Sequence, residues 1–170
     1  MDKTFLDELV EYPVKALRTI GTDPTVVQLL TDNPNIDMSS EEADAVFDEF
    51  LFDYGYVDAT TSEGAAYICV EAEASKSLTS TMQDMKLYVT IICHKQFMKI
   101  DTTKFKGMIG NRRDNLVRYT DKLLNGADIF GIGGLTLASA RTVPAPTGFS
   151  AREMTYIVPD FRKRKGFVSK

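Results

Sequence analysis

The sequence is poor in the residues that usually carry catalysis, metal binding or disulfide frameworks. Its 170 residues include one histidine, two cysteines and no tryptophan. This supply is too small for a disulfide framework, and a structural zinc site needs about four cysteine or histidine ligands. No apolar run reaches the roughly 18 residues that a membrane-spanning helix needs. The acidic start MDKTFLDELVEY also differs from a signal peptide. We therefore expect a protein of a reducing compartment, without cofactor, metal or membrane partner.

What the chain does have is a globular composition with an uneven charge distribution. Hydrophobic residues make up 44% and charged residues 26%. Residues 1–64 carry 15 acidic and 3 basic residues, a balance of −12. Residues 65–170 carry 9 acidic and 17 basic, a balance of +8, which leaves the net −4. Such a split suits a nucleic-acid or membrane surface, a subunit whose acidic part meets the basic part of a neighbouring copy, or two ordinary solvated faces.

The first third of the chain predicts helices. Residues 5–20 have one apolar side, and Pro13 is expected to kink or divide the segment. A short helix follows, capped by Asp23 with Pro24 at its first position. That apolar side consists of Phe5, Leu9, Ala16 and Leu17.

An acidic helix is expected over residues 39–56, where Ser39 and Glu42 have the spacing of a capping box. One side carries an apolar stripe and the other is rich in carboxylates, a pattern typical of a solvated face. The carboxylates that matter below are Glu41, Glu42, Asp44 and Asp48.

From residue 65 the hydrophobic period changes to two. The segments AAYICVEAEAS (65–75) and MKLYVTIICHK (85–95) alternate, which predicts two antiparallel strands joined by a long polar excursion. The next clear element is a helix capped by Asn111 and ended by Gly126. Two more alternating segments, 135–143 and 151–159, flank a proline-containing loop. The helix buries Leu116, Val117, Thr120, Leu123 and Leu124, and its other face carries Arg112, Arg113, Arg118 and Lys122.

This order of elements predicts an α+β fold: an antiparallel sheet of about four strands with helices packed on one face and an N-terminal helical region. We expect a single domain over 1–170. It consists of an acidic helical part at 1–64, a sheet core at 65–160 and a basic tail at 161–170.

Cys93 and His94 are the best candidates for a nucleophile and its base. Adjacent strand residues point to opposite faces, so their side chains cannot readily touch. A nucleophilic pair needs hydrogen-bond reach. Cys69 is expected on the side opposite Cys93, which also separates the two thiols. We therefore predict no catalytic residues and no metal site.

The glycine-rich stretch FGIGGL at 130–135 resembles a phosphate-binding loop only superficially. Such loops follow a strand and precede a helix, whereas here a helix precedes and a strand follows. A turn leading the chain from helix into sheet is the better interpretation.

The basic helix face and the basic tail could contact DNA phosphates, which requires only positive charge within reach. Aromatic interleaving for base stacking is not expected in either segment. A solvated helix face and a tail that grips an acidic partner explain these residues equally well.

The element order resembles that of the tail terminator (tail-completion) proteins of tailed bacteriophages. In this family a helical part, here ALRTIGTDPTVVQLLTDNP, leads into two long strands, here YICVEAEAS and MKLYVTIICHK. A long excursion, KSLTSTMQD, joins the strands. A helix similar to NLVRYTDKLLNG then packs across the sheet, and strands similar to LTLASARTV and AREMTYIVP close the fold.

The resemblance implies a structural virion protein, assembled in the host cytoplasm, and no enzyme. Its copies would form a ring, commonly of six, that caps the tail tube, joins the tail to the neck and leaves a channel for DNA. Partners would be further copies, the tail-tube protein, a neck or head-closure protein, and DNA that passes without sequence recognition. Contacts with neighbours are expected from Leu78, Thr79, Met82, Arg162, Lys163, Arg164 and Lys165.

The exposed edges of such a sheet would pair head to tail with neighbouring copies. The four helix carboxylates are candidates to line the channel, so reversing their charge should disturb DNA passage or ring formation. Normal particle yield and infectivity of that variant would contradict this assignment. Three alternatives stay open: another neck component such as a head-closure or adaptor protein, a small cytoplasmic enzyme or ligand-binding domain around His94 or the glycine turn, and a DNA-contacting module.

Overall fold

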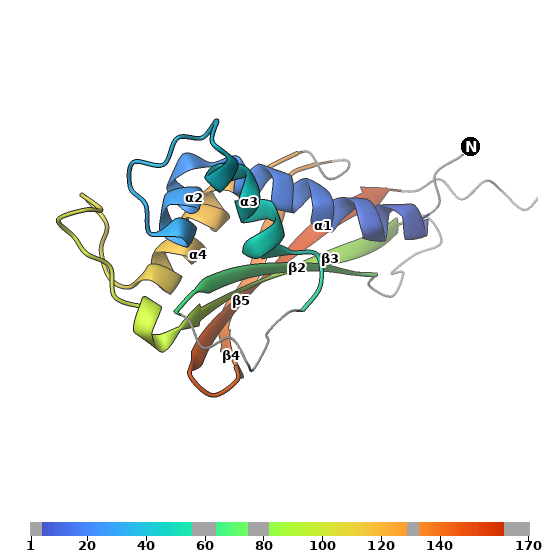
Figure 1. Ribbon diagram of the computed structural model, residues 1–170. Helices are drawn as coiled ribbons and strands as arrows, with labels where there is room; N and C mark the ends of the chain where they lie inside the picture. Colours follow the sequence, from blue (N-terminus) through green and yellow to red (C-terminus); the bar gives the residue numbers. More distant parts are fainter. Residues whose placement is uncertain (1–4, 56–63, 75–81, 129–132, 162–170) are drawn as a thin grey trace, which may run out of the picture.

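The computed structural model of the protein describes residues 5–55, 64–74, 82–128 and 133–161 (Figure 1). Its helices are α1 (Phe5–Gly21), α2 (Pro24–Thr31), α3 (Glu41–Glu49) and α4 (Arg112–Leu124). A short 3-10 helix, η1, spans Lys95–Phe97. Its strands are β1 (Leu51–Phe52), β2 (Ala66–Ala74), β3 (Met82–His94), β4 (Thr136–Val143) and β5 (Phe149–Phe161).

The strands form one mixed sheet in the order β1-β2-β3-β5-β4. β3 is central and pairs antiparallel with β2 on one side and β5 on the other. β4 pairs antiparallel with β5, whereas β1 pairs parallel with β2. The α+β prediction is confirmed, but the sheet has a fifth strand and is not purely antiparallel.

The fifth strand arises where a longer helix was expected. α3 ends at Glu49, and Leu51 and Phe52 pair with Ile68 and Cys69 of β2. The residue that caps α3 is Ser40, whose hydroxyl oxygen accepts from the Ala43 amide at 3.3 Å. The helix predicted over 39–56 is therefore present, but it is shorter than expected and is capped by Ser40 instead of Ser39. The aromatic residues Phe50 and Phe52 suit a strand, because aromatic side chains are enriched in strands.

All four helices gather on one face of the sheet, as Figure 1 shows and as expected. The core between the two layers contains residues of α1, α2, α3, α4 and the three central strands, including Ile20, Leu30, Val89, Leu116 and Tyr156. The helical part and the sheet thus share one hydrophobic core. Period-two alternation explains this side of the sheet, because Val70, Val89 and Met154 are all fully buried.

α1 runs unbroken through Pro13, so the expected division at this residue was wrong. Proline removes one helical hydrogen bond. Burial of Ala16, Leu17 and Ile20 on the same helix offsets that loss by holding α1 on the sheet.

The two ends of α4 match their prediction. The Asn111 side chain accepts from the Asp114 amide at 2.9 Å, and Gly126 has the left-handed φ of 85°. Of the residues expected in the core, Leu116, Thr120 and Leu124 are buried, whereas Val117 and Leu123 are half-buried. The hydroxyl of the fully buried Tyr156 donates to Asp121 at 2.9 Å, which ties β5 to α4.

Candidate functional site

Cys93 and His94 lie on opposite faces of the sheet, as the alternation predicted. The Cys93 thiol is fully buried in the core beneath the helices. The imidazole of His94 packs edge-on against Phe149, with ring centroids 5.0 Å apart, and its Nδ1 accepts from the Gln96 amide at 3.3 Å. His94 therefore caps η1, while burial raises the pKa of Cys93 to about 11. The two groups do not form a nucleophile–base pair.

The two cysteines are also separated by the sheet. Cys69 is buried on the face away from the helices, in a cluster with Tyr67, Ile92 and Phe149. Over the described ranges, no three histidine, cysteine or acidic side chains come together as metal ligands would.

The structure describes the two ends of the glycine-rich turn, and backbone hydrogen bonds join them. The Gly126 amide donates to the Leu135 carbonyl and the Leu135 amide donates to the Ala127 carbonyl, both at 2.8 Å. A Cβ atom on Gly134 would lie 2.8 Å from the Gly126 carbonyl oxygen. Glycine at 134 thus permits two backbone segments to approach, which accounts for it without a phosphate ligand.

Two of the four basic residues on α4 are buried, contrary to the sequence prediction. Arg112 is 2% exposed, and its guanidinium donates to the carbonyl oxygens of Leu29 and Phe97 and to the carboxylate of Asp32. It also lies over the Phe97 ring, 3.9 Å from the centroid. Arg112 thereby joins the end of α2 and the loop before α4, and it is not available to DNA.

Arg113 is the second buried cation. It donates to Ser150 at 2.6 Å and to Asp114 at 2.9 Å, and Arg152 lies 3.4 Å from the same Asp114 oxygen. Burial works against ionisation of Asp114, but its bonds to Arg113 and Asn111 outweigh it and lower the pKa of this carboxyl. These contacts fix the start of α4 on β5.

Only Arg118 and Lys122 remain on the exposed side of α4. Tyr119 lies between them, with Lys122 Nζ 4.9 Å and the Arg118 guanidinium carbon 5.5 Å from its ring centroid. The expectation that no aromatic residue interleaves with the basic residues of this helix was therefore wrong.

The two edges of the sheet are different in kind. β4 forms one edge, and six of its eight residues are exposed, with none buried. At the other edge β1 covers only Ile68 and Cys69 of β2, so 70–74 have no outer strand partner among the described residues. Unpaired edge backbone is a template for strand addition. Each edge thus offers a surface for pairing with another chain.

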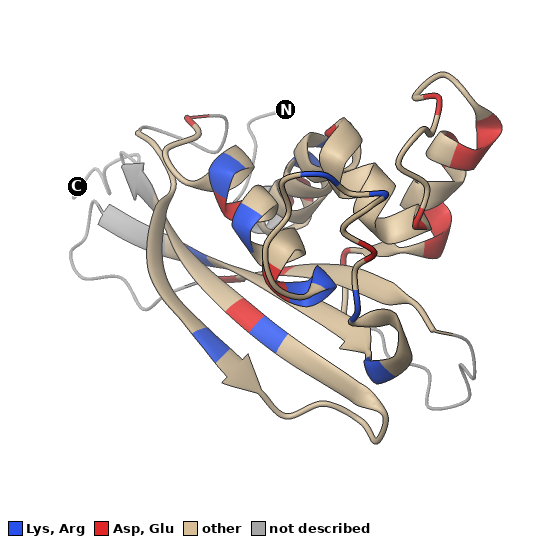
Figure 2. Cartoon of the chain, turned by 90° about the vertical axis from the view of Figure 1, so that its left-hand side faces the viewer, with Lys and Arg blue, Asp and Glu red and all other residues tan. Residues whose placement is uncertain are grey.

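Acidic and basic side chains separate between these two edges. α3 lies against β1, and its carboxylates Glu41, Glu42, Asp44 and Asp48 are all exposed. α4 lies over β3 and β5, on the side of β4, and exposes Arg118 and Lys122. Figure 2 shows the acidic residues of α3 on one side of the molecule and the basic residues of α4 on the other. The charge split of the sequence therefore corresponds to a separation in space.

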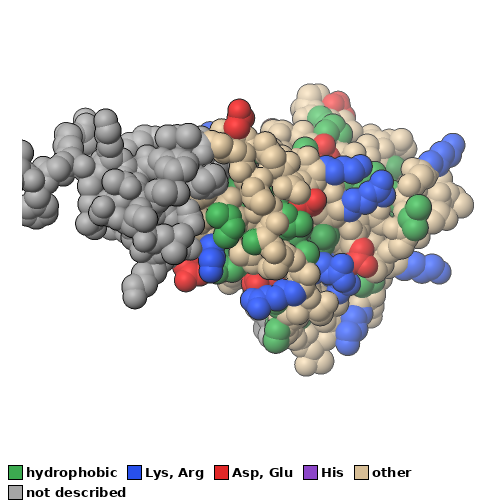
Figure 3. All heavy atoms as spheres, turned by 180° about the vertical axis from the view of Figure 1, so that it is seen from behind, with side chains coloured by type: hydrophobic (Ala, Val, Ile, Leu, Met, Phe, Trp, Pro, Cys, Tyr) green, Lys and Arg blue, Asp and Glu red, His purple; other side chains and the backbone are tan. Residues whose placement is uncertain are grey.

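The open face of the sheet does not repeat this separation. A shallow depression of about 310 Å³ spans β2, β3 and β5 and is lined by Glu71, Glu73 and Glu153 with Tyr88 and Ala72. The hydroxyl of Tyr88 donates to Glu73 at 2.7 Å, and this bond raises the pKa of Tyr88. At the β4 edge Arg141 is two-thirds exposed and pairs with Glu153 at 2.8 Å. Seen from behind, many lysine and arginine side chains gather on the half of the molecule away from the grey atoms (Figure 3), which is the end that carries the loop between η1 and α4 in Figure 1.

Most of the neighbour contacts expected from the sequence fall outside the described residues. This applies to Leu78 and Thr79 of the excursion and to Arg162, Lys163, Arg164 and Lys165 of the tail. Met82 begins β3, where its Cα pairs with that of Phe161. Conversely, Arg141 and the exposed edge of β4 were not singled out from the sequence, because strand order cannot be read from alternation.

The geometry defines an α+β protein with two open sheet edges, one beside the exposed carboxylates of α3 and the other on the side of the exposed Arg118 and Lys122 of α4. Among curated proteins none matches the chain. The family model of YomW matches residues 23–158, from the cap of α2 into β5, so the chain belongs to the YomW family, a Bacillus phage-like family. No helix in the described part of the chain is long and apolar enough to cross a membrane.

Proposed function

We propose that this protein is a structural component of a phage particle, a tail terminator-like ring subunit. Its copies, about six by resemblance, would cap the tail tube, contact the tail-tube and neck proteins, and leave a channel for DNA. Two findings support the proposal: membership of a phage-like family, and an element order similar to that of tail terminators. The proposal contains no catalytic step.

The observation that carries the proposal is the difference between the two open sheet edges. The exposed carboxylates of α3 lie beside the β1–β2 edge, and Arg118, Lys122 and Arg141 lie on the side of β4, so complementary charge favours pairing of one edge with the other. Contacts between unlike surfaces are head to tail and generate rings when the rotation closes. Pairing β4 of one copy with 70–74 of the next also brings Arg118 and Lys122 toward the neighbour's α3.

In this arrangement the acidic residues of α3 serve the contact between copies. Complementary charge of this kind sets orientation and association rate more than affinity. The backbone hydrogen bonds of the added strand would supply most of the binding. Lining of the DNA channel by the same carboxylates is the alternative role.

Charge reversal separates these two roles. The acid-reversed variant carries Glu41→Lys, Glu42→Lys, Asp44→Lys and Asp48→Lys, and the base-reversed variant carries Arg118→Glu and Lys122→Glu. If the charges meet between copies, each variant alone fails to form rings, and an equimolar mixture restores rings of alternating copies. Native mass spectrometry identifies alternation from the two masses. If the mixture does not form rings, the proposed contact between α3 and the neighbour's α4 is contradicted. If the acid-reversed variant forms rings by itself, the channel role of the α3 carboxylates is favoured.

Another neck component, such as a head-closure or adaptor protein, would use the same edges for ring formation. The protein to which the rings bind distinguishes a terminator-like subunit from another neck component. A terminator-like subunit should cosediment with polymerised tail-tube protein and stop tube growth, whereas a head-closure protein should bind the portal side of the neck.

A further inference from the structure

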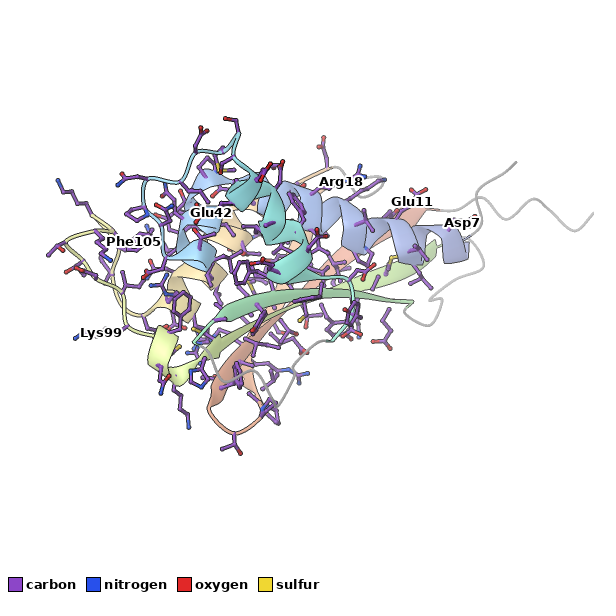
Figure 4. The ribbon with its side chains drawn as sticks, viewed as in Figure 1. Asp7, Glu11, Arg18, Glu42, Lys99 and Phe105 are labelled. Atoms are coloured by element: carbon purple, nitrogen blue, oxygen red, sulfur yellow. The ribbon has the colours of Figure 1, made fainter. Side chains whose placement is uncertain are left out.

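One side of α1 forms an exposed ridge that neither the core nor the sheet edges use. The ridge comprises Asp7, Val10, Glu11, Val14, Lys15 and Arg18, which fall within one arc of about 140° at 100° per residue. Its opposite side carries the buried Tyr12, Ala16, Leu17 and Ile20. Figure 4 shows Asp7, Glu11 and Arg18 in a row along the helix.

The ridge has an apolar flank. Val10 is 68% exposed, and it is one of three large hydrophobic residues that are exposed in the described structure. Val14 follows one turn later and is half-buried, and a shallow groove runs along both residues and along Glu11, Lys15 and Arg18. Val10 and Val14 thus give the ridge a small apolar flank that a second apolar surface could cover.

The charges of the ridge are ordered along the helix. Asp7 and Glu11 occupy its first half, and Lys15 and Arg18 its second half. Glu11 and Lys15 already approach to 3.7 Å within the helix, with side chains that are 33% and 44% exposed. A helix that is acidic at one end and basic at the other is complementary to an antiparallel copy of itself.

We infer that the α1 ridge binds the α1 ridge of a second copy in an antiparallel, two-fold symmetric contact. With the axis between Glu11 and Val14, Asp7 of one copy lies opposite Arg18 of the other. Glu11 then lies within one residue of the partner's Lys15, and Val10 within one residue of the partner's Val14. A two-fold axis brings equal flanks together, so the valines meet on one side of the contact and Glu11 meets Lys15 on the other.

The contact is small, so it should be weak and reversible. One ridge of about 16 Å per copy is far below the surface that a permanent dimer buries. Exposed ion pairs are screened by salt. Association should therefore depend on protein concentration and fall as salt is raised.

This inference does not depend on the proposed ring, because the ridge lies on the side of α1 opposite Tyr12, Ala16 and Ile20, the buried residues by which α1 packs on the sheet. The two contacts can coexist: head-to-tail pairing uses β4 and β2, and the α1 ridge pairs copies across a two-fold axis. Experiments on the ridge are best done in the base-reversed variant of α4, which should not form rings.

Sedimentation equilibrium of the full chain in that background tests the inference. Asp7→Lys with Glu11→Lys makes every ridge charge positive, and Lys15→Glu with Arg18→Glu makes every one negative. Each variant alone should dimerise at least tenfold more weakly than its parent, and their mixture should form a heterodimer. Circular dichroism checks that α1 stays helical. A parent that stays monomeric at about 500 µM, or variants that dimerise as well as the parent, would overturn the inference.

The register is tested separately by engineered cysteines. Asp7→Cys with Arg18→Cys should give a disulfide-linked dimer under mild oxidation, and either substitution alone should give at least tenfold less. Equal cross-linking by the single variants would overturn the antiparallel register. Absence of any linked dimer while an unrelated helical partner binds the ridge would show that its occupant is not a second copy.

Discussion

The Nη1 atom of Arg112 donates a 2.6 Å hydrogen bond to the carbonyl oxygen of Leu29, 83 positions earlier in the chain. Leu29 lies in the last turn of α2, where carbonyl groups have no helical partner. The same guanidinium reaches Asp32, the left-handed residue that ends α2, and the carbonyl of Phe97. One buried cation thus closes a helix end and fastens a loop.

Replacing Arg112 by methionine should lower the free energy of unfolding by about 3 kcal/mol. The substitution keeps much of the apolar volume but leaves buried carbonyl oxygens and a carboxylate without their donor. Denaturation by urea measures the change. Arg118→Met, on the exposed side of the same helix, is the control and should alter stability by less than about 0.5 kcal/mol. Equal effects of the two substitutions would refute the assigned role of Arg112.

Gly134→Ala should destabilise the protein by about 1 to 3 kcal/mol, because the new Cβ would lie 2.8 Å from the backbone oxygen of Gly126. Backbone cannot move aside as a side chain can. Gly55→Ala is the matched control, since among the described residues its Cβ would meet only a Glu71 oxygen at 3.6 Å. Thermal unfolding compares the two. An unchanged melting temperature for Gly134→Ala would show that the turn is looser than described.

The stability of the protein should fall between about pH 9 and pH 11 as Cys93 titrates. Burial raises the pKa of this thiol from 9.0 to about 11, so the unfolded chain loses the proton first and unfolding becomes easier as pH rises. The stability contributed below pH 9 is about 2 kcal/mol and is lost by pH 11. Cys93→Ala should flatten the pH dependence of urea unfolding in this window. An identical pH slope in the variant would contradict the assignment.

Lysine at Ala138 and Ala140 should prevent assembly through β4 without unfolding the chain. Both side chains are exposed, and edge lysines disfavour strand addition. We expect the concentration for half-assembly to rise at least about tenfold, with an unchanged far-ultraviolet circular dichroism spectrum. Thr147→Lys, in the exposed loop after β4, controls for added charge. If both variants assemble like the parent, β4 is not the edge that pairs.

The parts of the fold that were predictable from the sequence depend on local pattern. Alternation separated Cys93 from His94, and capping chemistry placed both ends of α4 at Asn111 and Gly126. The burial of Arg112 was not predictable, because its partner Asp32 lies 80 positions away on another helix. β1 was missed for the same reason: two residues become a strand only through pairing with β2.

The candidate surfaces, too, were predictable only as far as they depend on local sequence. The sequence revealed an acidic first third and a basic remainder, but their positions at opposite edges of the sheet follow from strand order. The order β1-β2-β3-β5-β4 places α3 and β4 far apart, and no local pattern encodes it. The ridge on α1 was likewise not predictable from the sequence, because the exposure of Val10 follows from the continuity of α1 through Pro13 and from its packing on the sheet.

Electron cryomicroscopy of the purified chain of residues 1–170 shows both the symmetry of any assembly and the strands at each contact. If the copies pair head to tail, we expect closed rings in which β4 of every copy pairs with 70–74 of the next, so that α3 faces the neighbour's α4. Particles that contain only single copies or two-fold pairs, or rings whose contacts leave β4 unpaired, would contradict it.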